Sequence, residues 1–376
     1  GSGPTAFSRQ GDGRCALGPA IREYIMSEAM YFLAVPTSRC LAVVTTGEPV
    51  SRETLKPGAV VTRVASSHIR VGTFQYFAIR NDIASLTALL DYAINRHYPE
   101  INIAPENKAV QFLEMVIAKQ IALVVEWMRV GFIHGVMNTD NVAISGETID
   151  FGPCAMIGIY DPHTVYSSID TKGRYAFGNQ PNITLWNMTR LAECLLPLIS
   201  NDEKAAIAIV EPLLMQFSQQ FEHAYFKMLA NKLGLTEIAP SDQIFIAELL
   251  EIMKNKRLDY TQLFTDLTQS LDDDNLAHKL KDKLGDWYDR WKVYSGDSQE
   301  NINIAKALMQ TNNPIVIPRN HHVEKVLKAC EETGNMQAAD DFLTVLRSPY
   351  NEIANTIHYQ DVPMDDDRNY CTFCGT

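Results

Sequence analysis

The pattern in residues 106–152 restricts the possible folds of this chain more than any other part of the sequence. Residues 106–131, ENKAVQFLEMVIAKQIALVVEWMRVG, carry apolar side chains at helical spacing and end at a glycine, which predicts one long helix. Two short motifs follow directly, HGVMNTDN at 134–141 and IDFG at 149–152. A long helix that leads into a loop with an amide and a carboxylate side chain indicates a site for a metal ion and phosphate groups.

The two motifs resemble the catalytic loop of protein kinases, His-x-Asp-x-x-x-x-Asn followed by Asp-Phe-Gly. In this comparison His134 is the scaffold histidine, and Asn141 and Asp150 are oxygen ligands suited to Mg²⁺. Val136 stands where such a loop has its catalytic aspartate. A chance Asp-Phe-Gly tripeptide is the alternative, but the loop, the spacing and the preceding helix together favour a phosphate-handling site.

The missing base leaves the role of a neighbouring carboxylate open. Val136 cannot accept a proton, so the usual activation of a hydroxyl towards the γ-phosphate is absent. Asp140, beside Asn141, can act as the base from another direction, or it can orient the metal ligand through a hydrogen bond.

Further candidate phosphate contacts lie near the N-terminus. Arg63 and Arg70 lie on or just after a predicted strand, in TRVASSHIR. They are either ordinary surface cations or a pair that neutralises phosphate oxygens, which arginine does in bidentate fashion. If a nucleotide reacted at its α-phosphorus, the leaving pyrophosphate would need several such cations. Asp12 and Gly13 lie in a Gly-rich turn that either contacts a ligand or only reverses the chain.

Length and composition are those of a globular protein. The chain has 376 residues, 46% hydrophobic and 21% charged, enough for two domains or one large domain with an extension. The net charge of −12 and the lack of an apolar run near the roughly 18 residues that cross a bilayer predict neither nucleic-acid nor membrane partners. Seven irregularly spaced cysteines are no secreted disulfide framework, so we expect most to be reduced.

The order of elements predicts an α+β, mostly helical fold of protein-kinase-like type, with a partial N-lobe and an expanded helical C-lobe. We expect a helix from Gly18 to near Pro36, strands at 40–46 and 58–67, a helix at 82–98, a hairpin across Gly146 that delivers Asp150, and helices from 182 onwards. The expected domains are residues 1–80 as the partial N-lobe, 81–235 as the C-lobe with the catalytic loop, and 236–376 as a helical extension with a Cys-containing tail.

Several long motifs extend the comparison over nearly the whole chain: GSGPTAFSRQGDGR, SEAM, RVASSHIRVGTFQ, HGVMNTDN, TIDFGP, GRYAFGNQP, WNMTRLAECLLPL and the closing YCTFCGT. With these motifs the sequence resembles the selenoprotein O family of protein adenylyltransferases. The resemblance implies a kinase-like fold that binds ATP in a flipped orientation with Mg²⁺ (or Mn²⁺). It also implies transfer of AMP, rather than phosphate, to Ser, Thr or Tyr hydroxyls of protein substrates.

The resemblance also assigns roles to particular residues. Asp140 corresponds to the proton acceptor of the family, and Asn141 and Asp150 correspond to its Mg²⁺ ligands, with Asp150 also near the nucleotide. Glu23 corresponds to the glutamate that forms an ion pair with a strand lysine. The other nucleotide contacts correspond to Asp12, Gly13, Arg63 and Arg70.

Two features of the ends of the chain follow from the same resemblance. The lysine of the family directly precedes GSG, so we expect a fragment that lacks the N-terminal part of the N-lobe and has little or no activity. The family carries a redox-active cysteine or selenocysteine at its C-terminus, which implies redox roles for Cys371, Cys374 and Cys154. A labile Cys154–Cys374 disulfide would tether the tail, whereas a simply buried Cys154 and a disordered tail are the alternatives.

Two other functions stay open. The first is a kinase that transfers the γ-phosphate with Asp140 as its base. The second is a catalytically inactive, nucleotide-binding pseudokinase scaffold, which Val136 and the absent lysine favour, whereas the two metal ligands oppose it. The expected location is the cytoplasm of a bacterium, or the mitochondrion if the source is eukaryotic.

Overall fold

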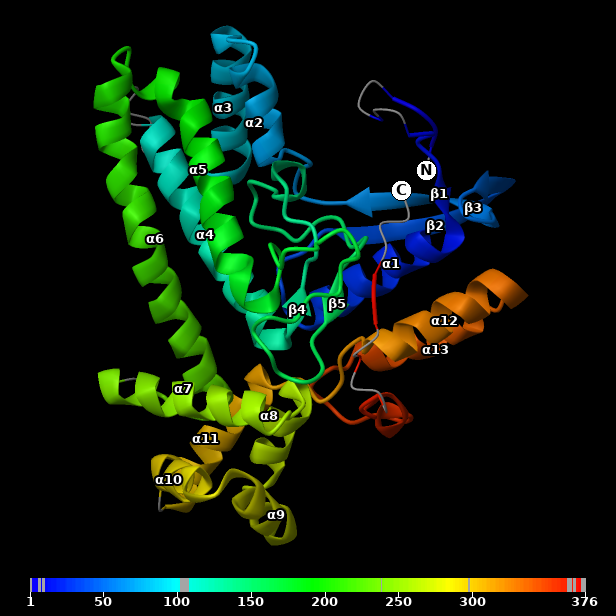
Figure 1. Cartoon of the computed structure of the whole chain (residues 1–376), viewed down its shortest axis with the longest axis vertical. Helices are drawn as coiled ribbons and strands as arrows, with labels where there is room; N and C mark the ends of the chain where they lie inside the picture. Colours follow the sequence, from blue (N-terminus) through cyan, green and yellow to red (C-terminus); the bar gives the residue numbers. More distant parts are fainter. Residues whose placement is uncertain are drawn as a thin grey trace.

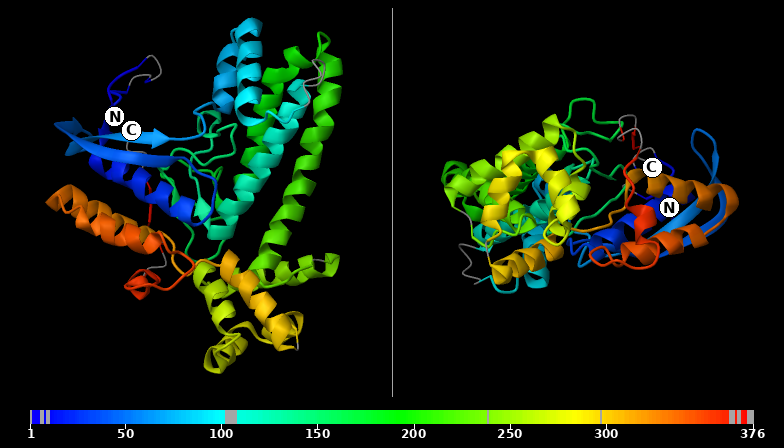
Figure 2. Two further views of the ribbon diagram at one scale, coloured as in Figure 1. Left: turned by 180° about the vertical axis from the view of Figure 1, so that it is seen from behind. Right: turned by 90° about the horizontal axis from the view of Figure 1, so that it is seen from below.

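The computed structural model describes residues 2–5, 8, 11–101, 108–237, 239–296, 298–363, 367 and 370–372. Helices dominate these residues, beside a three-stranded and a two-stranded sheet, so the α+β, mostly helical prediction is confirmed. Figures 1 and 2 show the larger sheet and its helix on one side, long helices on the other, and irregular loops between them.

The larger sheet is antiparallel and has the order β1-β3-β2. Its strands are β1 (Cys15–Ala16), β2 (Arg39–Ser51) and β3 (Leu55–Val64), so the β-branched runs form a hairpin that is longer than predicted at its turn. Helix α1 (Leu17–Phe32) packs on the sheet and confirms the predicted first helix. Its apolar side chains enter the core, and the charged Arg22 and Glu23 are buried with them.

A group of helices forms the opposite side of the molecule. They are α2 (Val71–Ala78), α3 (Ile83–His97), α4 (Lys108–Val130), α5 (Gln180–Ile199) and α6 (Glu203–Lys232). Helix α4 is the long helix predicted from its apolar spacing, and Phe112, Val116 and Val124 are fully buried along it. Because α4 packs against both α5 and α6, its end at Gly131 starts the loop that carries His134 and Asn141 from a rigid support.

The loops between the two sides carry only short elements: β4 (Phe132–Ile133), η1 (Thr139–Asn141), β5 (Ala155–Met156) and η2 (Phe177–Asn179). The predicted hairpin across Gly146 is wrong. Ala143 bridges to Arg70, and Thr148 bridges to Thr37, so the two arms pair with other parts of the chain rather than with each other. A single turn remains, in which the Gly146 N–H donates to the Ala143 carbonyl at 3.1 Å.

The C-terminal part is helical, as predicted; in Figure 1 its first helices form the lower part of the molecule and its last two long helices lie at the right. Helices α12 and α13 pack against α1. One hydrophobic core contains residues from Leu17 to Leu346, and the division into three domains stays a prediction. The elements of this part are α7 (Pro240–Asn255), α8 (Tyr260–Gln269), α9 (Asp274–Leu284), α10 (Asp286–Tyr294), α11 (Gln299–Asn312), α12 (Asn320–Thr333), α13 (Gln337–Leu346) and η3 (Thr356–Tyr359).

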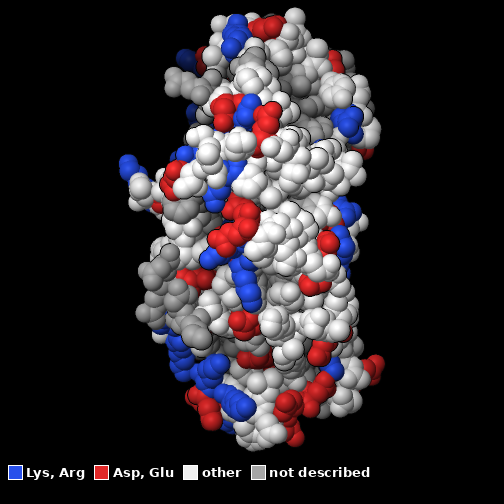
Figure 3. Space-filling model, turned by 90° about the vertical axis from the view of Figure 1, so that its right-hand side faces the viewer, with Lys and Arg blue, Asp and Glu red and all other residues white. Residues whose placement is uncertain are grey.

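Figure 3 shows lysine and arginine side chains interspersed with acidic ones on the face that it presents. Within the described ranges, none of the helices combines the length and the apolar character that crossing a membrane requires.

Candidate active site

A buried histidine joins the loop at 134–141 to the Asp-Phe-Gly segment at 150–152. His134 is fully buried, and its Nε2 lies 2.9 Å from the carbonyl oxygen of Ile149, the residue before Asp150. Burial lowers the pKa of His134, so the ring is neutral at pH 7 and its Nε2–H donates to that carbonyl. His134 therefore sets the position of Asp150 relative to the loop.

Gly135 allows the two segments to approach closely. Its φ of +83° lies in the left-handed region, and a Cβ there would lie 2.5 Å from the carbonyl oxygen of Pro153. Only glycine combines this backbone conformation with this close contact. Gln180, at the start of α5, accepts from the His134 N–H at 3.0 Å and donates to the Phe132 carbonyl at 3.0 Å.

The amide of Asn141 is oriented by the residue that replaces the usual base. Asn141 Nδ2 donates to the backbone carbonyl of Val136 at 3.1 Å, which makes Oδ1 the atom that can coordinate a cation. The Val136 side chain is 7% exposed and packs in the core. Position 136 thus supports Asn141 through its backbone and contributes no acid or base.

Asp140 lies at the N-terminus of α2. A Cβ on Gly72 would lie 2.5 Å from Asp140 Oδ1, so the absence of a side chain at residue 72 makes room for the carboxylate. A negative charge at this place is stabilised by the positive end of the α2 helix dipole.

Asp150 has a left-handed backbone, with φ of +70°. A non-glycine residue with this conformation needs support from its surroundings and is a frequent feature of functional sites. The support comes from α1, because the next N–H, of Phe151, donates to Glu23 Oε2 at 2.8 Å. Glu23 Oε1 accepts from Arg63, whose Nε lies at 2.7 Å and whose Nη2 lies at 2.5 Å.

Arg70 completes the group. Burial, followed by the positive charge of Arg63, lowers the pKa of Arg70, and the carboxylates of Asp150 and Asp140 oppose this shift. Arg70 thus interacts electrostatically with both acidic residues of the site. Its buried Nε finds no hydrogen-bond partner among the residues that the structure describes. One region therefore holds Arg70, Arg63, Glu23, Asp140 and Asp150.

Asp12 and Gly13 lie elsewhere. Arg52 binds the Asp12 carboxylate with Nη1 at 2.9 Å, and this hydrogen bond and the one from the Arg14 N–H hold the pKa of Asp12 at about 2. Cys15, two residues after Gly13, pairs with Ala59 on β3. Arg63 is four residues farther along the same strand, which places it roughly 13 Å from Ala59. The proposed nucleotide contacts at residues 12 and 13 stay a prediction.

The cysteine residues of the tail prediction are only partly described. Cys154 is fully buried, burial raises the pKa of its thiol to about 12, and the thiol donates to the Phe151 carbonyl at 3.2 Å. Thr372 Oγ1 donates to the Pro153 carbonyl at 2.7 Å, so the tail reaches the residue next to Cys154. Cys371 is exposed, and Cys374 lies outside the described residues. The Cys154–Cys374 pairing is untested.

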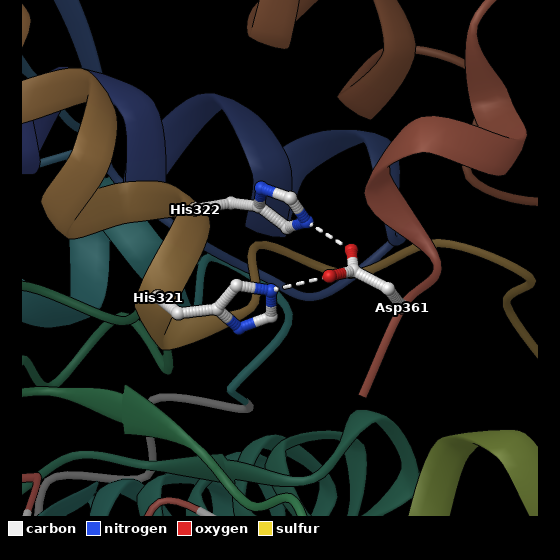
Figure 4. A group of neighbouring side chains, drawn as sticks. All are labelled: His321, His322 and Asp361. Atoms are coloured by element: carbon white, nitrogen blue, oxygen red, sulfur yellow. Dashed lines mark hydrogen bonds and ion pairs between the residues drawn. The ribbon is translucent and has the colours of Figure 1, made fainter. Parts of the chain in front are cut away.

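A second polar cluster lies at the start of α12 (Figure 4). Both imidazoles point towards the Asp361 carboxylate, with His322 Nε2 2.5 Å from Oδ1 and His321 Nε2 3.3 Å from Oδ2. These ligand types could hold a transition-metal ion. However, each imidazole forms a hydrogen bond with a different oxygen of the Asp361 carboxylate, and these two bonds already explain the arrangement.

Comparison with known proteins identifies the class. The chain is 52% identical over 378 residues to the protein nucleotidyltransferase YdiU of Teredinibacter turnerae, covering 100% of this chain and 78% of that protein. It is 50% identical over 376 residues to the protein of the same name from Pseudoalteromonas translucida, with the same two coverages. The Bacillus mycoides protein of that name is 49% identical over 376 residues, covering 100% and 77%. The relatives are thus protein nucleotidyltransferases.

The family follows from a second match. Residues 1–347 match the family described as protein adenylyltransferase SelO. The chain belongs to this family, as the motifs in its sequence predicted. The Teredinibacter turnerae protein is covered over 78% of its length, and neither comparison says which part of it lies outside the match, so the expectation of a missing N-terminal part is not supported.

Proposed function

We propose that this protein transfers AMP from ATP to hydroxyl groups of protein substrates. Membership of the SelO family and the names of the relatives support this activity and do not favour a kinase or an inactive scaffold. The observation that carries the assignment to this site is the grouping of Asp140, Asp150 and Arg70 beside a loop in which valine replaces the kinase base.

The proposed reaction is a displacement at the α-phosphorus of ATP. The acceptor oxygen forms a bond to this phosphorus, the bond to the oxygen that bridges to the β-phosphate breaks, and pyrophosphate leaves. Asp140 accepts the proton of the acceptor hydroxyl. Arg70 remains protonated and neutralises part of the charge that develops on the pyrophosphate. We propose Ser, Thr and Tyr as acceptors.

The residues also fit a divalent cation, for which we propose Mg²⁺ or Mn²⁺. Asn141 offers Oδ1 because its Nδ2 is occupied by Val136, and Asp150 offers a carboxylate, so both donors are hard oxygen atoms. The cation would neutralise phosphate charge and polarise the reacting phosphorus. Arg63 binds Glu23 with Nε and Nη2, so we propose that its contribution to nucleotide binding is indirect, through the position of Glu23.

The arrangement of elements supports a kinase-like fold for this activity. A helix with a buried glutamate, a β-hairpin, a long helix, a loop with His134 and Asn141 and an Asp-Phe-Gly segment follow one another in the order that such a fold requires. The proposed partial N-lobe, C-lobe and helical extension correspond to residues 1–80, 81–235 and 236–376.

Isotope labelling tests the function. With α-labelled ATP, Mg²⁺ and a protein acceptor, we expect label on the acceptor, and with γ-labelled ATP we expect none. Asp140→Asn should lower the transfer rate by about 10²–10⁴-fold, as loss of a general base does. Asp282→Asn, an exposed aspartate on α9, is the control and should have no effect. Label from the γ-position alone would show a kinase instead.

A further inference from the structure

Arg22 is a buried arginine that the proposed reaction does not use directly. It lies on α1 beside Glu23 and is 7% exposed. Its guanidinium donates to three groups that are distant in sequence: Nη1 to Glu324 Oε1 at 2.8 Å, and Nη2 to the Cys154 carbonyl at 2.7 Å and to the Tyr370 hydroxyl at 3.0 Å. Since a buried cation is stable only with such partners, these contacts fix its position.

Arg22 and Glu23 together hold both ends of one short segment. Glu23 accepts from the N–H of Phe151, and Arg22 donates to the carbonyl of Cys154. Asp150 directly precedes this segment and has a left-handed backbone that needs support. The position of α1 therefore controls where the Asp150 carboxylate lies.

The C-terminal residues hold Arg22 in turn. The Tyr370 hydroxyl accepts from Arg22 and donates to Glu324 Oε1 at 2.8 Å, so it links the cation to its carboxylate on α12. Thr372 is fixed on the other side, because its N–H donates to the Tyr166 carbonyl at 2.7 Å and its hydroxyl donates to the Pro153 carbonyl at 2.7 Å. Figure 1 shows the red C-terminal chain passing between α12 and β5 to reach these contacts.

Helix α12 adds a further link between the tail and the site. Asn320 Oδ1 accepts from the Met156 N–H at 2.9 Å, and Asn320 Nδ2 donates both to the Met156 carbonyl at 2.9 Å and to Asp367 Oδ2 at 2.9 Å. The same helix thus binds β5 and the tail, and no cysteine side chain takes part in the contacts that link the tail, Arg22 and this segment.

We propose that Arg22 is a positioning residue for the AMP-transfer reaction, and that Tyr370 and Thr372 complete the active site by holding Arg22 and the segment after Asp150 in place. This inference rests on the proposed function. It gives the C-terminal residues a role in catalysis through hydrogen bonds, independent of any disulfide. Without the tail contacts, α1 and the segment 151–154 lose their common support, and the proposed metal ligand Asp150 becomes mobile.

Tyr370→Phe tests the proposal with the smallest change. Phenylalanine keeps the ring against Tyr166, whose centroid lies 5.5 Å away, and removes only the hydroxyl. We expect the Phe151 amide to exchange with deuterium about tenfold faster, because a hydrogen bond to a charged group is lost at its support. We also expect about tenfold slower AMP transfer and a higher concentration of Mg²⁺ for half-maximal rate.

The matched control is Tyr288→Phe on α10, which removes a hydroxyl that donates to Ser270 Oγ at 3.1 Å. It should change neither Phe151 exchange nor the Mg²⁺ requirement. Arg22→Lys keeps the charge but cannot make all three contacts, so we expect it to act like Tyr370→Phe. Unchanged exchange of the Phe151 amide in Tyr370→Phe would overturn the proposal.

The exchange measurement needs no nucleotide, so it separates two failures. A wild-type protein without AMP transfer would contradict the proposed function, whereas exchange of Phe151 that ignores Tyr370 would contradict the positioning role alone. If the Mg²⁺ requirement rose equally in Tyr288→Phe, the effect would be a general loss of stability and the proposal would be wrong.

Discussion

At the scale of single residues, the candidate site depends on backbone conformations that few side chains tolerate. Gly135 and Asp150 both have positive φ, of +83° and +70°. Glycine meets this requirement without strain, whereas Asp150 needs the hydrogen bond from Phe151 to Glu23 beside it. The strained residue is also the proposed metal ligand, so its side-chain direction is set by its neighbours.

Gly135→Ala should destabilise the fold strongly. The new Cβ would lie 2.5 Å from the Pro153 carbonyl oxygen in a left-handed backbone, so we expect a loss of about 2–4 kcal/mol in the free energy of unfolding. Gly334→Ala is the control, because φ is +67° there but nothing lies within 4 Å of the added Cβ; its loss should be about 1 kcal/mol. Urea unfolding measures both. Equal losses would show that the contact with Pro153 does not matter.

At the scale of helices and strands, ion pairs join elements that are distant in sequence. Glu23 and Arg63 join α1 to β3 beside the site. Farther away, Arg319 before α12 binds Asp259 before α8 with two hydrogen bonds, of 2.9 and 3.1 Å. Both of these side chains are almost completely buried, so the pair joins the start of α12 to the start of α8.

Arg319→Met should therefore be costly. It leaves the Asp259 carboxylate buried without its partner, and we expect a loss of about 3–5 kcal/mol in the free energy of unfolding. Lys281→Met removes the pair with Asp289, whose atoms lie 3.0 Å apart with both side chains about half exposed, and should change little. Thermal unfolding of the two variants compares them. A small effect in both would mean that Asp259 finds another partner or becomes hydrated.

At the scale of the whole molecule, one extended core buries several groups that ionise at high pH. Burial raises the pKa of Cys154 and Tyr160 to about 12, and that of Cys40 and Cys194 to about 11. In the unfolded chain the corresponding values are 9.0 for cysteine and 10.0 for tyrosine. The folded protein thus binds protons more tightly than the unfolded chain in this pH range.

Stability should therefore fall in alkali. The contribution of these groups is complete below about pH 9, and it is lost as the pH rises towards their folded pKa values, because only the unfolded chain ionises there. For each fully buried thiol, the free energy of unfolding should fall by on the order of 1 kcal/mol per pH unit in this range. Denaturant unfolding between about pH 8 and 10.5 measures this slope, and Cys154→Ala should reduce it. A flat profile would contradict the burial of these thiols.

Much of the fold could be predicted because it follows from local patterns. The apolar spacing of α4, the β-branched runs of β2 and β3, and the spacing of His134, Asn141 and Asp150 each depend on neighbouring residues. Roles that needed long-range partners were missed. Gln180 lay in a quoted motif, and Arg22 stood beside a recognised glutamate, but no sequence signal joined either one to its partners.

The sequence alone determined the helices, the paired strands, the order of the site motifs and the family, because backbone propensity and motif spacing are properties of adjacent residues. Only the tertiary structure decided which chemical groups meet. Glu23 reaches Phe151 across 128 positions, Arg22 reaches Tyr370 across 348, and the expected hairpin gave way to bridges with Arg70 and Thr37. These contacts depend on how the whole chain packs, since a buried polar group binds whichever partner the surrounding elements bring within reach.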